Sequence, residues 1–385
     1  MLTLSVKNKF ESYRVNSLDR HRRPIDARDD TSIYLDQKNL INFSSNDYLG
    51  LSTHPFIKDA FIEGVRNYGF GSGSSAMISG YFEPQRKLED KFAEYLGRDR
   101  AILFNSGYHA NLGVIQAIAN RHSSILSDRL CHASIMDGIQ LSRAKHVRYQ
   151  HCDVNHVNHL IKKNSSINLI ITESVFSMEG DIAPIAQLAK IAQENHALLM
   201  VDDAHGIGVI GNSAKGICDY TDITSNDIDC LITPLGKAVG SIGALVSGNE
   251  ELMEIILQFA RTYTYTTALP PAVVVAILAS FEIMQAENWR RDKLQSIIKF
   301  FIKHAEQRNI LLNSKNLTPI KTIIIGDNQK VIMLQNKLIS HGFFVAGIRS
   351  PTVPAGTARI RISLNCNHHE SDIERLLDLL YDYHK

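Results

Sequence analysis

Short apolar runs alternate with amphipathic stretches along residues 50–280. Seven runs are rich in β-branched and other apolar residues and are typically followed by Gly, Asp or Ser: 100–107, 123–128, 146–151, 168–175, 197–206, 230–237 and 243–248. Between them lie stretches with helical spacing of apolar residues, such as "QRKLEDKFAEYLG" (85–97) and "PIAQLAKIAQEN" (184–195). Strands that alternate with helices predict an α/β fold, in which helices cover both faces of a mostly parallel seven-stranded sheet.

The pattern changes at both ends of the chain. Residues 1–45 are polar and partly helical, and their last part, "NLINFSS", predicts a short strand. After residue 285 the pattern predicts a second unit of helices and strands: 288–309, 320–327, 342–348, 358–365 and 370–385. We therefore expect an N-terminal arm (1–45), a large domain (46–284) and a smaller C-terminal α+β domain (285–385).

The composition narrows the class of protein. The chain has 385 residues, 44% of them hydrophobic, and a formal net charge of +1. This balance gives no electrostatic footprint for nucleic acid or for an anionic membrane. The basic run "RHRRP", from Arg20 to Pro24, is typical of a solvated surface. The longest uncharged run, 262–280, contains two prolines and many hydroxyl groups, so we do not expect it to span a membrane.

The five cysteines stand at 131, 152, 218, 230 and 366, form no Cys-x-x-Cys pair and are odd in number. A disulfide framework or a metal site is therefore not expected. Reduced thiols, together with an N-terminus that lacks an apolar signal-peptide core, predict a cytoplasmic protein.

Polar residues follow four of the predicted strands. They occur in "NSGYHAN" (105–111), "DRLCHAS" (128–134), "DDAHG" (202–206) and "GK" (236–237). In open α/β sheets, ligands bind beyond the carboxyl ends of the strands, so these groups are expected to meet. Each alone has an ordinary interpretation: an acid after a strand often caps the next element, Gly-Lys is common in turns, and "SGY" is a plain helix start.

Taken together, the four groups predict a pyridoxal phosphate site. The cofactor needs an amine for a Schiff base, an acid beside its pyridinium nitrogen and a helix N-terminus for its phosphate. Lys237 lies between two apolar runs, where desolvation lowers the pKa of an amine and favours the reactive neutral form.

These residues fall within motifs that resemble the α-oxoamine synthases, which are fold-type I pyridoxal-phosphate enzymes. The resemblance runs from about residue 10 to the C-terminus and rests on these segments: "NFSSNDYLGLSTHP", "ISGYFEPQRKLEDKFAEYLG", "LFNSGYHAN", "DRLCHASIMDGIQLS", "ESVFSMEGDIAP", "VDDAHGIGVIG", "GKAVG", "LPPA" and "IRSPTVPAGTARIRISL". The last segment, with its Arg-x-Pro-Thr-Val-Pro core, resembles one branch of this family in particular. That branch acts in biotin biosynthesis and condenses L-alanine with a pimeloyl thioester, carried by coenzyme A or an acyl-carrier protein, to 8-amino-7-oxononanoate and carbon dioxide.

The resemblance implies four catalytic residues. Lys237 would bind the cofactor covalently and later move the substrate Cα proton. Asp202 would pair with the pyridine nitrogen, His205 would bond the phenolic oxygen, and His132 would stack on the ring.

It also implies a phosphate site and a shared active site. The backbone amides of Gly107 and Tyr108 would hold the phosphate, with Ser177 nearby. Thr267 resembles a residue that reaches the phosphate from the partner subunit, which implies an obligate homodimer.

Arginines are the natural partners of the substrate carboxylates. Arg359 and Arg361 stand two apart on one predicted strand, so both face the same side and spacing does not choose between them. The resemblance favours Arg361, assisted by Asn46, for the amino-acid carboxylate. Arg349 and the Arg20–Arg23 run suit the acyl partner, through the distal carboxylate of the pimeloyl chain or the phosphates of its carrier.

The chain departs from the family pattern at three positions. Pro234 stands where a phosphate-contacting Thr is usual, with Thr233 one residue earlier; Ser74 replaces a glycine; and Ala268 replaces a hydroxyl residue. Two other functions stay open: glycine C-acetyltransferase or another acyl-CoA:amino acid synthase of the family, and a non-catalytic scaffold. Lys237 argues against the scaffold, because such proteins commonly lose this lysine.

Overall fold

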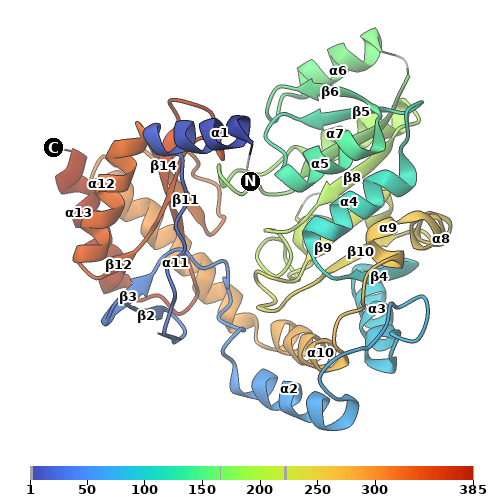
Figure 1. The fold of residues 1–385 in the computed structure, drawn as a ribbon, viewed down its shortest axis with the longest axis horizontal. Helices are drawn as coiled ribbons and strands as arrows, with labels where there is room; N and C mark the ends of the chain where they lie inside the picture. The colour runs from blue at the N-terminus through green and yellow to red at the C-terminus, as the bar shows by residue number, and fades with distance from the viewer. Residues whose placement is uncertain (1–2, 165, 221–222, 385) are drawn as a thin grey trace. The chain divides into compact units, whose positions relative to one another are not determined.

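The computed structural model describes residues 3–164, 166–220 and 223–384, which form two compact units (Figure 1). The central unit comprises Leu49–Ser177 and Asp181–Arg291. The terminal unit comprises Met1–Tyr48, Met178–Gly180 and Asp292–Lys385. The residues at the two ends of the sequence therefore belong to one unit.

A seven-stranded sheet forms the middle of the central unit, as the apolar runs predict. Its order is β4 (Arg100–Phe104), β10 (Ala244–Gly248), β9 (Cys230–Pro234), β8 (Leu198–Asp202), β7 (Ile167–Glu173), β5 (Ser124–Asp128) and β6 (Lys145–Tyr149). Every pair is parallel except the two that involve β10, which runs antiparallel to β4 and β9. The connection from β9 to β10, residues 235–243, holds no crossover helix, and a strand joined so closely to its neighbour pairs antiparallel with it.

Helices surround this sheet. They are α2 (Pro55–Tyr68), α3 (Glu83–Leu96), α4 (Gly107–Ile118), α5 (Ala133–Ser142), α6 (Val154–Lys163), α7 (Ile185–Glu194), α8 (Glu250–Phe259), α9 (Arg261–Thr264) and α10 (Pro271–Ala286), with the short 3-10 turns η1 (Gly216–Asp219) and η2 (Ser225–Asp227). α4, α5 and α8 share one apolar core with alternate strand residues such as Phe104, Ile232 and Val246. That alternation places these side chains on one face of the sheet and Thr233, between Ile232 and Pro234, on the other face.

The strands of the terminal unit form two small sheets. One has the order β1 (Ala27–Arg28), β2 (Ser32–Leu35), β3 (Lys38–Asn42) and β12 (Phe343–Phe344), and the other β11 (Ile320–Gly326), β14 (Ala358–Ser363) and β13 (Ala346–Ile348). Its helices are α1 (Leu4–Val15), α12 (Asn328–Ser340), α13 (Glu370–His384) and most of α11 (Asn288–Gln307). β3 pairs in parallel with β12, so the residues predicted as an arm are built into the sheet of this unit.

The three residues Met178–Gly180 are tied to the terminal unit by polar contacts. Ser314 Oγ and Thr318 Oγ1 donate to the Gly180 carbonyl at 3.3 and 2.6 Å. Gly180 has a φ of +75°, and a Cβ there would overlap the carbonyl of Ile320. A glycine is therefore required at this point of the chain.

No single helix among the described residues has the length and apolar composition to cross a membrane. The pair α10 and α11, bent by 69°, meets those two criteria only when both helices are taken together.

Candidate active site

Five predicted residues follow the carboxyl ends of strands in the central sheet. Gly107 comes after β4, His132 after β5, Ser177 after β7, Asp202 ends β8, and Lys237 comes after β9. These five strands all run in the same direction. Only β10, which lies between β4 and β9, runs in the opposite direction. Parallel strands end at the same edge of a sheet, so the polar residues gather there as the sequence predicts.

Asp202 is buried, 4% exposed, and its carboxylate is held on both oxygens. Asn111 Nδ2 donates to Oδ2 at 2.7 Å, and the Ala204 backbone N–H donates to Oδ1 at 3.1 Å. Two fixed donors thus hold the carboxylate in one orientation. Asp202 can therefore serve as the fixed anion that a protonated ring nitrogen requires.

Asn111 also connects Asp202 to His132. Its second amide hydrogen goes to Ser134 Oγ at 2.9 Å, and Ser134 Oγ lies 2.7 Å from His132 Nδ1. The Ser134 backbone N–H donates to the same Nδ1, so the Nδ1 atom is an acceptor and the ring proton is assigned to Nε2. One buried amide thus fixes both the anion and the tautomer of the histidine.

His132 is exposed at the start of α5 and is anchored by its backbone N–H, which donates to Glu173 Oε1 at 2.6 Å. Its pKa lies below the ordinary value: desolvation lowers it most, Asp202 raises it, and Lys237 lowers it. Asp202 and Lys237 therefore both lie close enough to His132 to affect its charge. The exposed ring suits the stacking role.

Lys237 lies on a bend that follows β9, and it is half-buried. The bend is closed by backbone bonds from Leu235 N–H to the Gly243 carbonyl (2.9 Å) and from Gly240 N–H to the Lys237 carbonyl (2.8 Å). Gly240 has a φ of +69°, and a Cβ there would be 2.6 Å from the backbone N of Ser52. The small residues around the lysine therefore allow a tight loop that holds one amine in place.

The N-terminus of α4 provides the anion site. Ser106 caps the helix by accepting from the His109 N–H at 3.2 Å, while the first amides, at Gly107 and Tyr108, face outward as at any helix start. Gly107 is needed for close packing, because a Cβ there would lie 2.6 Å from Pro234 Cγ. Tyr108 is exposed, and its hydroxyl donates to Asp137 Oδ2 in α5.

The other two predicted phosphate contacts also lie in the central unit. Ser177 is half-buried after β7, and Thr267 is exposed. The Thr267 carbonyl accepts from Asn105 Nδ2 of its own chain at 2.7 Å, two residues before Gly107. Ser74, which replaces a glycine of the family pattern, does not have positive φ and so is not strained there; the neighbouring Gly73 has a φ of +70°.

His205 is buried, 3% exposed, in the turn that follows β8. The neighbouring Asp203 is fully buried, and burial raises the pKa of its carboxyl to about 7. Asp203 Oδ2 accepts from the Ile217 N–H at 3.2 Å, and a Cβ at Gly206 or Gly216 would overlap its carboxyl. Asp203 therefore fixes the turn, whereas its neighbours Asp202 and His205 are the candidates for chemistry.

The two arginines that spacing left equivalent have different partners in the terminal unit. Arg359 forms a buried ion pair with Glu179 (2.9 Å) and donates to the Met178 carbonyl at 2.9 Å. Arg361 donates to Asn46 Oδ1 from both Nη atoms at 3.2 Å and to Ser363 Oγ at 2.8 Å. Arg359 thus has a structural partner, and Arg361 is the better candidate for a carboxylate.

Arg20 and Arg349 line one cavity of about 530 Å³ in the terminal unit. Arg349 is held by the carbonyls of Ser17 and Asp19, and Arg20 Nη2 donates to Thr352 Oγ1 at 3.0 Å. The cavity also contains His21 and Arg23, so its lining is rich in cationic and hydrogen-bonding groups.

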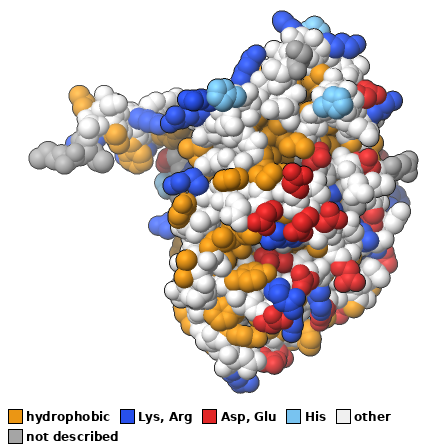
Figure 2. Space-filling model, turned by 90° about the vertical axis from the view of Figure 1, so that its right-hand side faces the viewer, with side chains coloured by type: hydrophobic (Ala, Val, Ile, Leu, Met, Phe, Trp, Pro, Cys, Tyr) orange, Lys and Arg blue, Asp and Glu red, His pale blue; other side chains and the backbone are white. Residues whose placement is uncertain are grey.

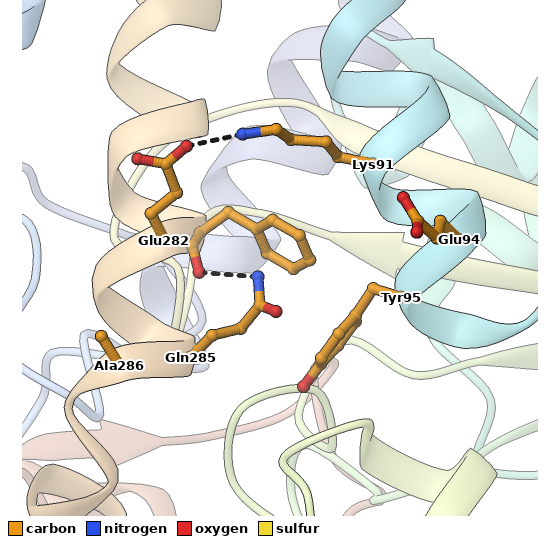
Figure 3. A pocket seen from close by; sticks show the side chains of 7 residues that line it. Lys91, Glu94, Tyr95, Glu282, Gln285 and Ala286 are labelled. Carbon is orange, nitrogen blue, oxygen red and sulfur yellow. Dashed lines mark hydrogen bonds and ion pairs between the residues drawn. The ribbon is translucent and has the colours of Figure 1, made fainter.

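Other features of the surface do not contain predicted residues. A cavity of about 580 Å³ between α3 and α10 is lined by residues including Lys91, Tyr95 and Glu282, with Lys91 Nζ paired to Glu282 at 2.6 Å (Figure 3). On the face drawn in Figure 2, acidic and basic side chains lie interleaved, with hydrophobic side chains exposed between them.

A group of Asp128, His151 and Cys152 has the donor types of a metal centre. Both ring nitrogens of His151 face carboxylates, Nδ1 at 3.1 Å from Asp128 and Nε2 at 2.8 Å from Asp181, and the two ion pairs raise the pKa of the imidazole against the effect of its burial, to about 12. Cys152 Sγ lies 3.8 and 3.7 Å from the two nitrogens, a position beside the ring rather than in line with either lone pair. The group is best described as a charged histidine bridging two acids.

The donor set in the central unit fits the cofactor expected from the sequence: an amine, a fixed carboxylate, a stacking imidazole and a helix N-terminus with no side chain at its first position. Sequence reasoning missed Asn111, Ser134 and Glu173, which orient these groups. A signal was present, because Asn111 and Gln116 are the two polar residues in the largely apolar stretch "ANLGVIQAIA", and Asn111 comes first after the predicted helix start.

Comparison with known proteins gives concordant results. The family model for aminotransferase class I and II matches residues 38–380. The chain is 44% identical to the 8-amino-7-oxononanoate synthase of Saccharophagus degradans, over 89% of this chain and 86% of that protein. The fold is similar to the 8-amino-7-oxononanoate synthase of Francisella tularensis (35% identity, TM-score 0.78, 89% and 97% covered). It is also similar to a serine palmitoyltransferase with pyridoxal phosphate bound (26% identity, TM-score 0.94, 100% and 98% covered).

Proposed function

We propose that this chain, which belongs to the class I and II aminotransferase family, catalyses the pyridoxal-phosphate-dependent condensation of L-alanine with a pimeloyl thioester. In this reaction a C–C bond forms between the alanine Cα and the thioester carbonyl, and the C–S bond breaks to release the thiol carrier. The alanine carboxylate leaves as carbon dioxide, and the product is 8-amino-7-oxononanoate. The observation that carries the proposal is the linked group of Lys237, His132 and Asp202, the latter two joined through Asn111.

The cofactor supplies an electron sink when it is bound. Lys237 Nζ would hold it covalently, and the same amine would take the proton from the substrate Cα and return one to the product carbon. When the cofactor is bound, Asp202 would keep a proton on its ring nitrogen, His205 would donate to its phenolic oxygen, and His132 would stack on its ring. The Gly107 and Tyr108 amides, with Ser177, would hold the phosphate.

We assign the amino-acid carboxylate to Arg361 and Asn46 of the terminal unit. A guanidinium presents parallel N–H groups that match a carboxylate. We assign the acyl donor to the cavity that contains Arg20 and Arg349. A distal carboxylate and the phosphodiester of a coenzyme A or carrier-protein arm are both anions, so either suits these arginines, and separate assays with the two donors distinguish them.

We further propose that the enzyme is a cytoplasmic homodimer. Large hydrophobic side chains are exposed on α2 and the segment after it, including Phe61 (39%), Ile62 (47%), Phe70 (89%) and Ile78 (81%). An apolar surface of this kind is typical of an interface. Thr267 would reach the phosphate of the partner subunit, which makes the active site shared. A solution mass of twice the 43.1 kDa chain supports the dimer, and a monomeric active enzyme overturns it.

The function is tested by product mass. The purified protein with pyridoxal phosphate is incubated with pimeloyl thioester and either L-alanine or glycine, and the products are measured by mass spectrometry. We expect 8-amino-7-oxononanoate with alanine only, and its loss in Lys237→Ala. Product from glycine with acetyl-CoA instead would keep the chemistry and overturn the substrate. Absence of product with every pair, despite a borohydride-reducible adduct on Lys237, would overturn the condensation itself.

A further inference from the structure

The side-chain amide of Asn46 is held by three donors on one atom. Asn46 Oδ1 accepts from Arg361 Nη1 and Nη2, both at 3.2 Å, and from the hydroxyl of Tyr48 at 3.2 Å. Because the two guanidinium N–H groups can only donate, the Asn46 oxygen must face them and Nδ2 must face the other way. The Nδ2 hydrogens are therefore directed away from this cluster.

Tyr48 is fully buried and acts on both partners. Burial raises the pKa of its hydroxyl to about 12, while the charge of Arg361 and a hydrogen bond from it have the opposite effect. The phenol thus keeps its proton at neutral pH. Its oxygen receives a hydrogen bond from Arg361 and its hydrogen is donated to Asn46.

The backbone around Tyr48 is fixed to the strand that carries Arg361 and to the residues after that strand. The Ser363 N–H donates to the Phe43 carbonyl at 2.8 Å, and the Cys366 N–H donates to the Tyr48 carbonyl at 3.0 Å. Asn365 Nδ2 donates to the Asp47 carbonyl. These bonds fix the backbone of the segment that contains Tyr48. The Tyr48 hydroxyl in addition orients the side chains of Asn46 and Arg361.

We propose that Tyr48 is a positioning residue for recognition of the amino-acid carboxylate. Its hydroxyl turns the Asn46 amide so that Nδ2 is presented as a donor, and it fixes the plane of the Arg361 guanidinium. Tyr48 itself does not touch the substrate. The inference rests on the proposed function, through the assignment of the carboxylate to Arg361 and Asn46.

Tyr48→Phe tests this, because it removes the hydroxyl and keeps the ring. In the enzyme loaded with pyridoxal phosphate, we expect the Kd for L-alanine, measured by absorbance titration without acyl donor, to rise about 5- to 10-fold. We expect kcat and the KM of the acyl thioester to stay within about 2-fold. Tyr149→Phe, at another fully buried tyrosine, is the matched control and leaves the Kd unchanged.

Arg361→Lys distinguishes the positioning role of Tyr48 from the assignment of the carboxylate to Arg361. If Tyr48 acts through Arg361 and Asn46, adding Tyr48→Phe to Arg361→Lys raises the Kd by clearly less than it does alone. A Tyr48→Phe variant with lower Tm but an unchanged Kd overturns the positioning role. An Arg361→Lys variant with an unchanged Kd overturns the carboxylate assignment of the proposed function, whatever Tyr48→Phe does.

Discussion

The ring of Pro234 leaves no room for a side chain at Gly107. A Cβ built at residue 107 would lie 2.6 Å from Pro234 Cγ and 3.1 Å from Pro234 Cβ. The proline that departs from the family pattern therefore packs directly against the first residue of α4. The proline thus has two effects: it removes the hydroxyl of the usual threonine, and its ring requires a glycine at residue 107.

Gly107→Ala is expected to weaken cofactor binding. The new methyl group overlaps the Pro234 ring, so the start of α4 must shift, and overpacking of this kind costs on the order of 1–3 kcal/mol. We expect the Kd for pyridoxal phosphate, measured by titration of the apoenzyme, to rise about 10-fold or more. Pro234→Ala in the same chain removes Cγ and should restore part of the affinity. Equal Kd values for the single and double variants would contradict the contact.

Pro234→Thr is expected to strengthen cofactor binding. Thr233 faces the opposite side of the sheet from Pro234, so it is not placed to supply the missing hydroxyl. A threonine at 234 would add one hydrogen bond to the phosphate, worth on the order of 1 kcal/mol. We expect the Kd for pyridoxal phosphate to fall several-fold. Thr233→Val, which removes only the hydroxyl at the neighbouring position, is the control and should leave this Kd unchanged.

Substitution of Arg359 should lower stability, whereas substitution of Arg361 should lower the affinity for alanine. Arg359→Met leaves Glu179 charged and buried, which typically lowers the free energy of unfolding by 3–5 kcal/mol. Arg359→Met combined with Glu179→Gln should recover much of that loss in denaturant unfolding. Arg361→Lys should instead raise the KM for alanine with little change in unfolding. If Arg359→Met raised the KM while leaving unfolding unchanged, the roles would have to be exchanged.

Lys321 makes the protein less stable at neutral pH. Its ammonium is fully buried in β11, where Nζ donates to the Asn316 carbonyl at 2.5 Å, and burial lowers its pKa from 10.5 to about 7. The folded state thus binds fewer protons than the unfolded state between pH 7 and 10.5, so stability rises with pH across that range. Lys321→Met should raise the free energy of unfolding at pH 7 by on the order of 2 kcal/mol, after loss of the hydrogen bond. It should also remove the slope; a slope that persists would point to another group.

Glu89 should give the opposite slope. It accepts from Tyr81, Gln85 and the Leu103 N–H, but burial dominates and raises the pKa of its carboxyl from 4.5 to about 7. The folded state therefore binds more protons than the unfolded state between pH 4.5 and 7, and stability falls as pH rises through that window.

Glu89→Gln keeps acceptor and donor atoms at this position and removes the charge. We expect an unfolding free energy higher by on the order of 1–2 kcal/mol at pH 8 and nearly equal to the parent at pH 4. Glu94→Gln, in the same helix, is the control and should show neither effect. A Glu89→Gln gain of the same size at both pH values would contradict a titration of Glu89.

The sequence predicted the central sheet well because each of its strands is a local pattern. All seven apolar runs became strands, and the polar residues after β4, β5, β7, β8 and β9 lie at one edge of the sheet, whereas β10 ends at the other edge. The N-terminal segment was harder to place, because the pairing of Ile41 with Phe343 joins residues about 300 positions apart and leaves no periodic trace. Resemblance named Asp202 and His132, but no spacing rule indicates that Asn111 binds one and orients the other.

The residues Met178–Gly180 belong to a unit whose other parts lie at the two ends of the sequence. The chain consequently passes from one unit to the other at 48/49, 177/178, 180/181 and 291/292. A segment cut out at residues 49–291 would therefore carry Met178–Gly180 with it, and the terminal unit would lose both the Glu179 partner of Arg359 and the Gly180 carbonyl that Ser314 and Thr318 bind.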